Sequence, residues 1–168
     1  MRGVTGRILI LALLAASATA HAGATFEVNA GVAVSYAKQD SASDTQVGGA
    51  WPGLAAGARF GDLAITGRLS AILFDGSVHV FAGPAIQWWA SERIFLGAGV
   101  GIGAIELEDE LPDGTAGYQT LGVSLRAGWN LRPERRHRIT LSLELTPGVY
   151  PDGLFDIGIA LAAGYQYW

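Results

Sequence analysis

The chain has 168 residues, of which 50% are hydrophobic and only 15% are charged, and its mean hydropathy is +0.31. This composition excludes a disordered chain and is unusual for a soluble domain, in which about 25% of residues are charged. Cysteine is absent, so disulfides, thiolate metal sites and cysteine nucleophiles are excluded. After residue 22 there is no run of about 18 apolar residues, so the apolar residues are spread over short segments rather than gathered in membrane helices.

The first 22 residues have the three parts of a secretory signal peptide. Arg2 and Arg7 give a positive start, residues 8–16 (ILILALLAA) are apolar, and Ala20-His21-Ala22 fits a cleavage site. An uncleaved membrane anchor is the alternative, although the apolar run is short for one. We expect cleavage to leave a single domain, 23–168, with 9 of the 11 basic residues, all 15 acidic residues and a net charge of −6. That charge argues against a nucleic-acid partner.

The remaining chain alternates between apolar residues and small or polar ones with a period of two, which is typical of strands with two different faces. In 138–149, for example, Leu141 and Leu143 alternate with Ser142 and Glu144. In 50–60 the alternation assigns Ala50 to the apolar face and Trp51 to the other face. In chain order the predicted strands are 26–36, 50–60, 63–73, 78–90, 94–104, 119–131, 138–149 and 155–167.

An even number of such segments, with small or polar residues on one face, predicts an all-β fold: an eight-stranded antiparallel up-and-down transmembrane β-barrel. A soluble β-sandwich is the alternative, but it would place apolar residues inside and charges outside. The predicted connections alternate between short turns, expected on the periplasmic side, and other loops, expected outside the cell. The short turns are 61–62, 91–92 and 132–136, and the loops are 38–49, 74–77, 106–116 and 150–153.

Aromatic residues on the apolar face gather at the strand ends that adjoin the short turns or the chain termini. Such a ring is expected at the level of the lipid headgroups, as an aromatic girdle. Aromatic packing in the core of a soluble sandwich is the alternative. The predicted girdle consists of Phe26, Phe60, Trp88, Trp129, Tyr165 and Tyr167.

Five charged residues fall on the opposite, inward face: Glu27, Arg59, Arg68, Arg126 and Glu144. Inside a narrow barrel such charges must pair or be hydrated, because an isolated buried charge is very costly. A hairpin centred near residue 135 would place Arg126 opposite Glu144, so we predict that pair, with Arg68 near it. We predict a second pair between Glu27 and Arg59. An ion-pair network that fills the interior is the favoured interpretation, and a narrow ion path is the alternative.

The sequence offers little enzymatic chemistry. A lipid-modifying barrel enzyme would need a histidine and a serine together on the lipid-facing wall, whereas His79 has inward parity and no such serine accompanies it. There is no Cys/His metal spacing, and the acidic loop 106–116 does not follow an EF-hand pattern. We expect no cofactor and no catalytic residue. Weak divalent-cation binding by that loop, bridging lipopolysaccharide phosphates, remains an alternative to simple solvation.

Two stretches resemble the small eight-stranded outer-membrane barrels of the OmpA-transmembrane-domain and OmpX type. These are 81–103 (FAGPAIQWWASERIFLGAGVGIG) and the C-terminal strand, FDIGIALAAGYQYW. The resemblance implies insertion into the outer membrane of a Gram-negative-type cell and recognition of the last strand by the barrel-assembly machinery.

The expected function is that of a monomeric, non-enzymatic outer-membrane barrel with a structural, envelope or surface-interaction role. Outer-membrane lipid and lipopolysaccharide are its expected surroundings. A narrow pore for ions or very small solutes and a lipid-modifying enzyme are the alternatives.

Overall fold

The computed structural model describes residues 23–39, 42–74, 77–107, 116–131, 136–150 and 153–167. The expected signal peptide, residues 1–22, lies outside these ranges, as do 108–115 of the acidic loop and 132–135 of the basic turn.

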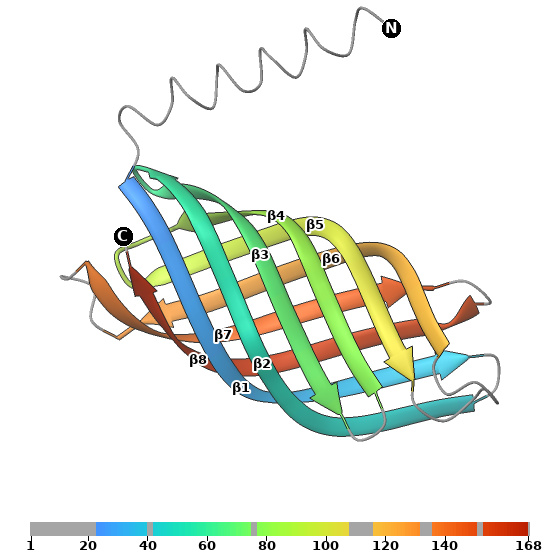
Figure 1. Ribbon diagram of the computed structural model, residues 1–168. Coiled ribbons are helices and arrows are strands. Elements are labelled where there is room, and N and C mark those ends of the chain that lie inside the picture. The colour runs from blue at the N-terminus through green and yellow to red at the C-terminus, as the bar shows by residue number, and fades with distance from the viewer. Residues whose placement is uncertain are drawn as a thin grey trace, which may run out of the picture.

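The described residues form eight strands that pair in chain order and close into a barrel, with β1 paired to β8 (Figure 1). Every pairing is antiparallel, which confirms the predicted fold class. The first strand begins and the last strand ends at the same end of the barrel, here called the turn end, and the opposite end is called the loop end. The strands are β1 (Gly23–Gln39), β2 (Ala42–Phe60), β3 (Leu63–Phe74), β4 (Ser77–Trp89), β5 (Ile94–Leu107), β6 (Ala116–Asn130), β7 (His137–Val149) and β8 (Phe155–Tyr167).

The period-two alternation of the sequence becomes an inside and an outside. In β7 the side chains of Arg138, Ser142 and Glu144 are buried, whereas Leu141 and Leu143 between them are exposed. Because successive side chains of a strand point to opposite faces, closing the sheet turns the polar face inward and the apolar face outward.

The first hairpin is longer than the sequence pattern indicated. Residues 38–49 were expected to be a loop, and this prediction is wrong, because pairing between β1 and β2 continues to Gln39 and Ala42. Asp44 and Thr45 in this extension are exposed. A strand is held by backbone hydrogen bonds, which polar side chains do not prevent. Because the extension is mostly polar, it has no apolar alternation from which a strand could be predicted.

The facing of β2 also changes within the strand. Ala50 is 8% exposed and Trp51 is 53% exposed, the reverse of the sequence assignment. The register of β2 shifts between Ala50 and Gly53, where Trp51 and Pro52 stand opposite the single residue Ala71 of β3, so β2 carries one extra residue. Proline has no N–H for a ladder hydrogen bond and is found in sheets at such bulges, so Pro52 is the local reason for the phase change.

Three apolar layers fill the interior at different heights. Ala64, Trp89 and Phe95 pack together at the turn end. Ile72 packs with small residues in a middle layer that consists of Ala33, Ala50, Ile72 and Ala160. Ile105, Tyr150 and Leu154 pack together at the loop end. The buried charged residues Glu27, Arg68, Arg126 and Glu144 lie between the first two layers.

Candidate functional site

Four charged side chains meet in the interior, and each is at most 7% exposed. They come from four different strands: Glu27 from β1, Arg68 from β3, Arg126 from β6 and Glu144 from β7. Arg68 forms an ion pair with Glu144 through both carboxylate oxygens, with Nε 3.2 Å from Oε1. Arg126 Nη1 lies 2.5 Å and 2.7 Å from the two carboxylate oxygens of Glu27.

The two pairs are connected to each other. Arg68 Nη1 lies 3.7 Å from Glu27 Oε1, so positive and negative groups alternate along one chain of contacts. The network contains two arginines and two carboxylates, so its net charge is zero. The side chain of Arg126 also lies over the Phe95 ring, with the guanidinium carbon 4.8 Å from the ring centroid.

Neutral side chains donate further hydrogen bonds to both carboxylates of the network. Ser70 and Ser124 donate to Glu144 Oε1 at 3.1 Å and 3.0 Å. Asn29 donates to one oxygen of Glu27 at 2.8 Å, and Gln166 donates to the other at 3.2 Å. Buried ions are tolerated only when such hydrogen bonds replace the lost water, so these four neutral side chains are part of the site.

The sequence predicted Arg68 near Glu144, where the structure places it, but the predicted pair of Arg126 with Glu144 is wrong. Arg126 does lie directly opposite Glu144, in the predicted register, with Gly128 opposite Ser142. The carboxylate of Glu144 nevertheless binds Arg68, which comes from the far side of the barrel. Neighbouring side chains on one wall point in parallel into the lumen, whereas side chains from opposite walls point toward one another.

The predicted pair between Glu27 and Arg59 is wrong. The Cα of Arg59 pairs with that of Gly23, four residues from Glu27, which is about 13 Å along a strand. Arg59 instead lies at the turn end, with Nη2 3.8 Å from Asp62 and its guanidinium carbon 4.6 Å from the Trp89 ring centroid.

A second buried polar cluster lies near the loop end. His79 Nδ1 lies 2.9 Å from Asp156 Oδ2, and Ser35 donates to Asp156 Oδ1 at 2.7 Å. The alternation of the sequence predicts that His79 faces inward, but it does not predict this partner. The inward parity of Asp156 and Ser35 was the available signal, although parity does not specify which strands face each other across a lumen.

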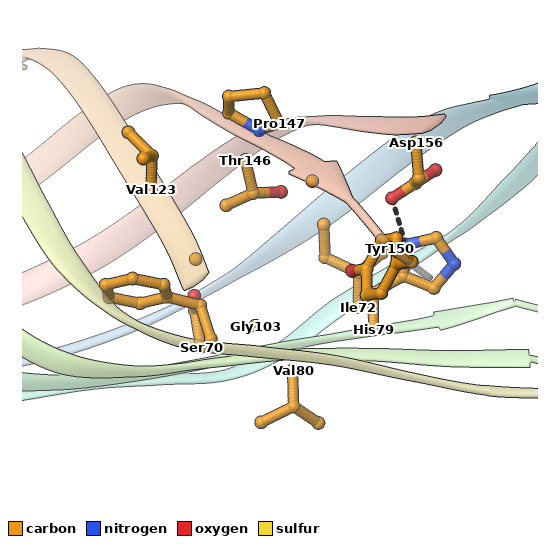
Figure 2. Close-up of a pocket in the computed structure, with 13 residues that line it drawn as sticks. Ser70, Ile72, His79, Val80, Gly103, Val123, Thr146, Pro147, Tyr150 and Asp156 are labelled. Atoms are coloured by element: carbon orange, nitrogen blue, oxygen red, sulfur yellow. Dashed lines mark ion pairs between the residues drawn. The ribbon is translucent and has the colours of Figure 1, made fainter. Parts of the chain in front are cut away.

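Two residues of the connection after β7 are buried at this end of the barrel. Tyr150 and Leu154 are each 7% exposed, and the Tyr150 amide donates to the Leu154 carbonyl at 2.8 Å. Tyr150 lines a small cavity together with His79 and Asp156 (Figure 2). Burial, together with the Asp156 carboxylate, raises the pKa of the Tyr150 phenol to about 12. Within the described ranges, no three His, Asp or Glu side chains lie close enough together to hold a metal ion.

The six aromatic residues of the predicted girdle all lie at the turn end of their strands. Phe26, Trp88 and Trp129 are 43%, 50% and 46% exposed. Phe60, Tyr165 and Tyr167 are half-buried and lie at the same end.

Solved structures contain the same barrel. Neisserial surface protein A (NspA) superposes with a TM-score of 0.64 at 16% identity, and the match covers 86% of this chain and 98% of that chain. The attachment invasion locus protein Ail of Yersinia pestis, solved with the heparin analogue sucrose octasulfate, gives a TM-score of 0.59 at 16% identity over 86% of this chain and 99% of that chain. Another structure of Ail gives 0.56 at 18% identity over 85% and 98%.

The chain has the fold of the small eight-stranded outer-membrane barrels. No family model matches the sequence, and no curated protein matches it. At identities of 16–18% the likeness establishes the fold, so the function has to be argued from the surface and interior of this chain.

Proposed function

We propose that this chain is an integral barrel of the outer membrane of a Gram-negative-type cell, with a structural or surface-interaction role and no enzymatic activity. The observation that carries the proposal is an inverted distribution of polarity. Among the described residues, 28 large hydrophobic side chains are exposed, whereas 18 polar or charged residues are buried. A water-soluble domain has the opposite arrangement.

The exposed apolar surface is too large to face water. Leu121 is 75% exposed, Val32 is 62% exposed and Leu161 is 58% exposed, and they lie on three different strands. Fully burying one such side chain is worth about 1.5–3 kcal/mol, so transferring the whole belt into lipid strongly favours insertion. The described residues contain no helix long and apolar enough to cross a membrane.

A passive role fits the interior. The charged side chains in the centre neutralise one another, and they hold no excess charge for a substrate. The cavity beside His79 and Tyr150 has a volume of about 20 Å³, which is room for about one water. His79 and Asp156 resemble the base and orienting group of a hydrolase, but this cavity is too small for a lipid or a sugar.

The narrow pore stays the weaker alternative. A path for ions would have to cross the middle layer, where Ile72 packs with Ala33 and Ala160. It would also have to pass Tyr150 and Leu154 at the loop end. Apolar constrictions of this kind exclude water and ions, which argues for a filled lumen.

The charge of the loop end bears on surface interactions. By sequence, this end carries a single basic residue, Lys38, and nine carboxylates: Asp40, Asp44, Asp75, Glu106, Glu108, Asp109, Glu110, Asp113 and Asp152. The heparin analogue is bound by Ail. An acidic end would repel such a polyanion, so a surface partner of this chain should be basic or should bind through divalent cations that bridge to lipopolysaccharide. We further propose that the barrel is monomeric and is inserted by the barrel-assembly machinery.

The experiment is fractionation of cells that express the full chain, followed by carbonate and urea washing of the membranes. The protein should remain in the outer-membrane fraction, and release by either wash would contradict the proposal. Planar-bilayer recordings and lipid A mass spectra of expressing and deleted strains test the two alternatives. Discrete channel openings would favour the pore, and a changed lipid A would favour the enzyme.

A further inference from the structure

The charges outside the interior network are divided between the two ends of the barrel. The loop end is strongly acidic, as described above. The turn end has the opposite sign, because by sequence six arginines there outnumber three carboxylates. The arginines are Arg59, Arg93, Arg132, Arg135, Arg136 and Arg138, and the carboxylates are Asp62, Glu92 and Glu134.

At the turn end, His137 and three aromatic side chains meet on the outer surface where β7, β8 and β1 adjoin. The registers place His137 and Phe26 on either side of Tyr167. The His137 ring centroid is 5.2 Å from that of Tyr167 and 5.9 Å from that of Tyr165. Phe26 lies 6.2 Å from Tyr165, and Arg136 is exposed immediately before β7. These five residues are called the turn-end patch.

Two polar groups of the patch, the His137 ring and the Tyr165 hydroxyl, are held in place by a hydrogen bond. His137 Nδ1 and the Tyr165 hydroxyl are hydrogen-bonded to each other, although both groups are at the surface. When the hydroxyl donates to Nδ1, the neutral ring carries its proton on Nε2 and offers a second donor to the surroundings. Arg136, one residue before, adds a guanidinium, whose donors match the geometry of a phosphate.

An apolar surface continues directly from the patch toward the middle of the barrel. Ile139 and Leu141 of β7 are 43% and 44% exposed, and Leu161 of β8 is 58% exposed. The patch therefore joins a basic, hydrogen-bonding surface to an apolar one. A phospholipid has the matching parts, a polar headgroup joined to apolar acyl chains. Tyrosine side chains are enriched at this boundary because one end of the ring is apolar and the other is polar.

We propose that the turn-end patch binds the headgroup of an anionic phospholipid, with its acyl chains along β7 and β8. Arg136 and His137 bind the phosphate, and Phe26 and Tyr167 pack against the glycerol region. The positive charge of the turn end attracts such lipids to it, whereas the acidic loop end repels them. This inference rests on the proposed membrane location and adds a lipid class and a site to it.

The experiment uses the purified full-length barrel inserted into vesicles of phosphatidylcholine, with and without phosphatidylglycerol. Native mass spectrometry measures the lipid that remains bound, and urea unfolding measures the stability. The wild type should retain phosphatidylglycerol preferentially and should unfold at a higher urea concentration in the mixed vesicles. Arg136→Gln should weaken the binding of phosphatidylglycerol about tenfold, in line with the loss of one charge-assisted contact. Tyr165→Phe, which removes the hydroxyl and keeps the ring, should weaken it less.

Arg93→Gln is the matched control, because Arg93 is also an exposed arginine of the turn end but lies in the connection before β5. It should keep the preference for phosphatidylglycerol. An equal loss in Arg93→Gln and Arg136→Gln would show general attraction to a basic end and would overturn the specific site. Equal retention of both lipids by the wild type would also overturn it, while leaving the membrane proposal intact. Failure to insert into either vesicle would contradict the membrane location and this inference together.

Discussion

Replacing Glu144 by glutamine should destabilise the barrel more than any single change on its outer face. The substitution keeps the shape of the side chain and removes its charge. It also breaks the ion pair with Arg68 and weakens the bonds from Ser70 and Ser124. Arg68 is then 7% exposed, and its nearest remaining carboxylate is that of Glu27, 3.7 Å away. Removing one partner of a buried pair costs about 3–5 kcal/mol.

The assay is urea unfolding in lipid vesicles, with the folded fraction read from gel mobility without boiling. Leu143→Ala is the control, because Leu143 is the next residue along β7 but is 52% exposed on the outer face. Its loss of free energy of unfolding should be clearly smaller than that of Glu144→Gln.

A double-mutant cycle identifies the partner of Glu144. Combining Glu144→Gln with Arg68→Gln should cost less than the sum of the single changes, by about 2 kcal/mol, because no unpaired charge remains. Combining Glu144→Gln with Arg126→Gln should recover less, because Arg126 binds Glu27. Additive costs for Glu144 and Arg68, or a stronger coupling to Arg126, would refute the assignment of pairs across the lumen.

Other changes test the packing, the blocked lumen and the assembly of the barrel. A Cβ on Gly128 would lie 2.1 Å from the Phe95 ring, so Gly128→Ala should lower the free energy of unfolding by about 1–3 kcal/mol. A Cβ on Gly67 would have no atom within 4 Å, so Gly67→Ala should be close to neutral in the same urea assay. Ile72→Ala opens the middle apolar layer and should raise conductance in planar bilayers, whereas the outward Leu73→Ala should not, and equal conductance would contradict the blocked lumen. Deleting residues 165–168 removes the end of β8 that pairs with β1 and β7, so less protein should reach the membrane, and normal insertion of the truncated chain would disprove this role of the C-terminus.

The sequence predicted the fold well because alternation is a strong signal when both faces are long and chemically distinct. All eight strands were located, and the register between β6 and β7 followed from a short turn and matching parity. The predicted aromatic residues of the turn end share that end in the structure, because parity and distance from a turn together specify their positions.

The failures have a common physical origin, which is that parity is a local property. The bulge at Trp51 and Pro52 reverses which face the residues of β2 point to. The predicted strand 50–60 assumed one unbroken alternation, so it assigned Ala50 and Trp51 to the wrong faces. The polar extension of the first hairpin carries no alternation. The partners of Glu27 and Glu144 depend on which strands face each other across the lumen, so Arg126 was assigned to Glu144 and Arg59 to Glu27, both incorrectly. The pair of His79 and Asp156 was missed for the same reason.

Site-directed spin labelling tests most directly whether the outer face lies in lipid. The chain has no cysteine, so Leu143→Cys and Asp62→Cys each provide a single labelling site. Leu143 is on the outer face in the middle of β7, and Asp62 is in the turn before β3, with its side chain 78% exposed. In vesicles, the label at 143 should collide with dissolved oxygen more than with a water-soluble nickel complex, and the label at 62 should show the reverse. If the nickel complex reached position 143 as readily as position 62, the outer face would be in water and the membrane-barrel account would be wrong.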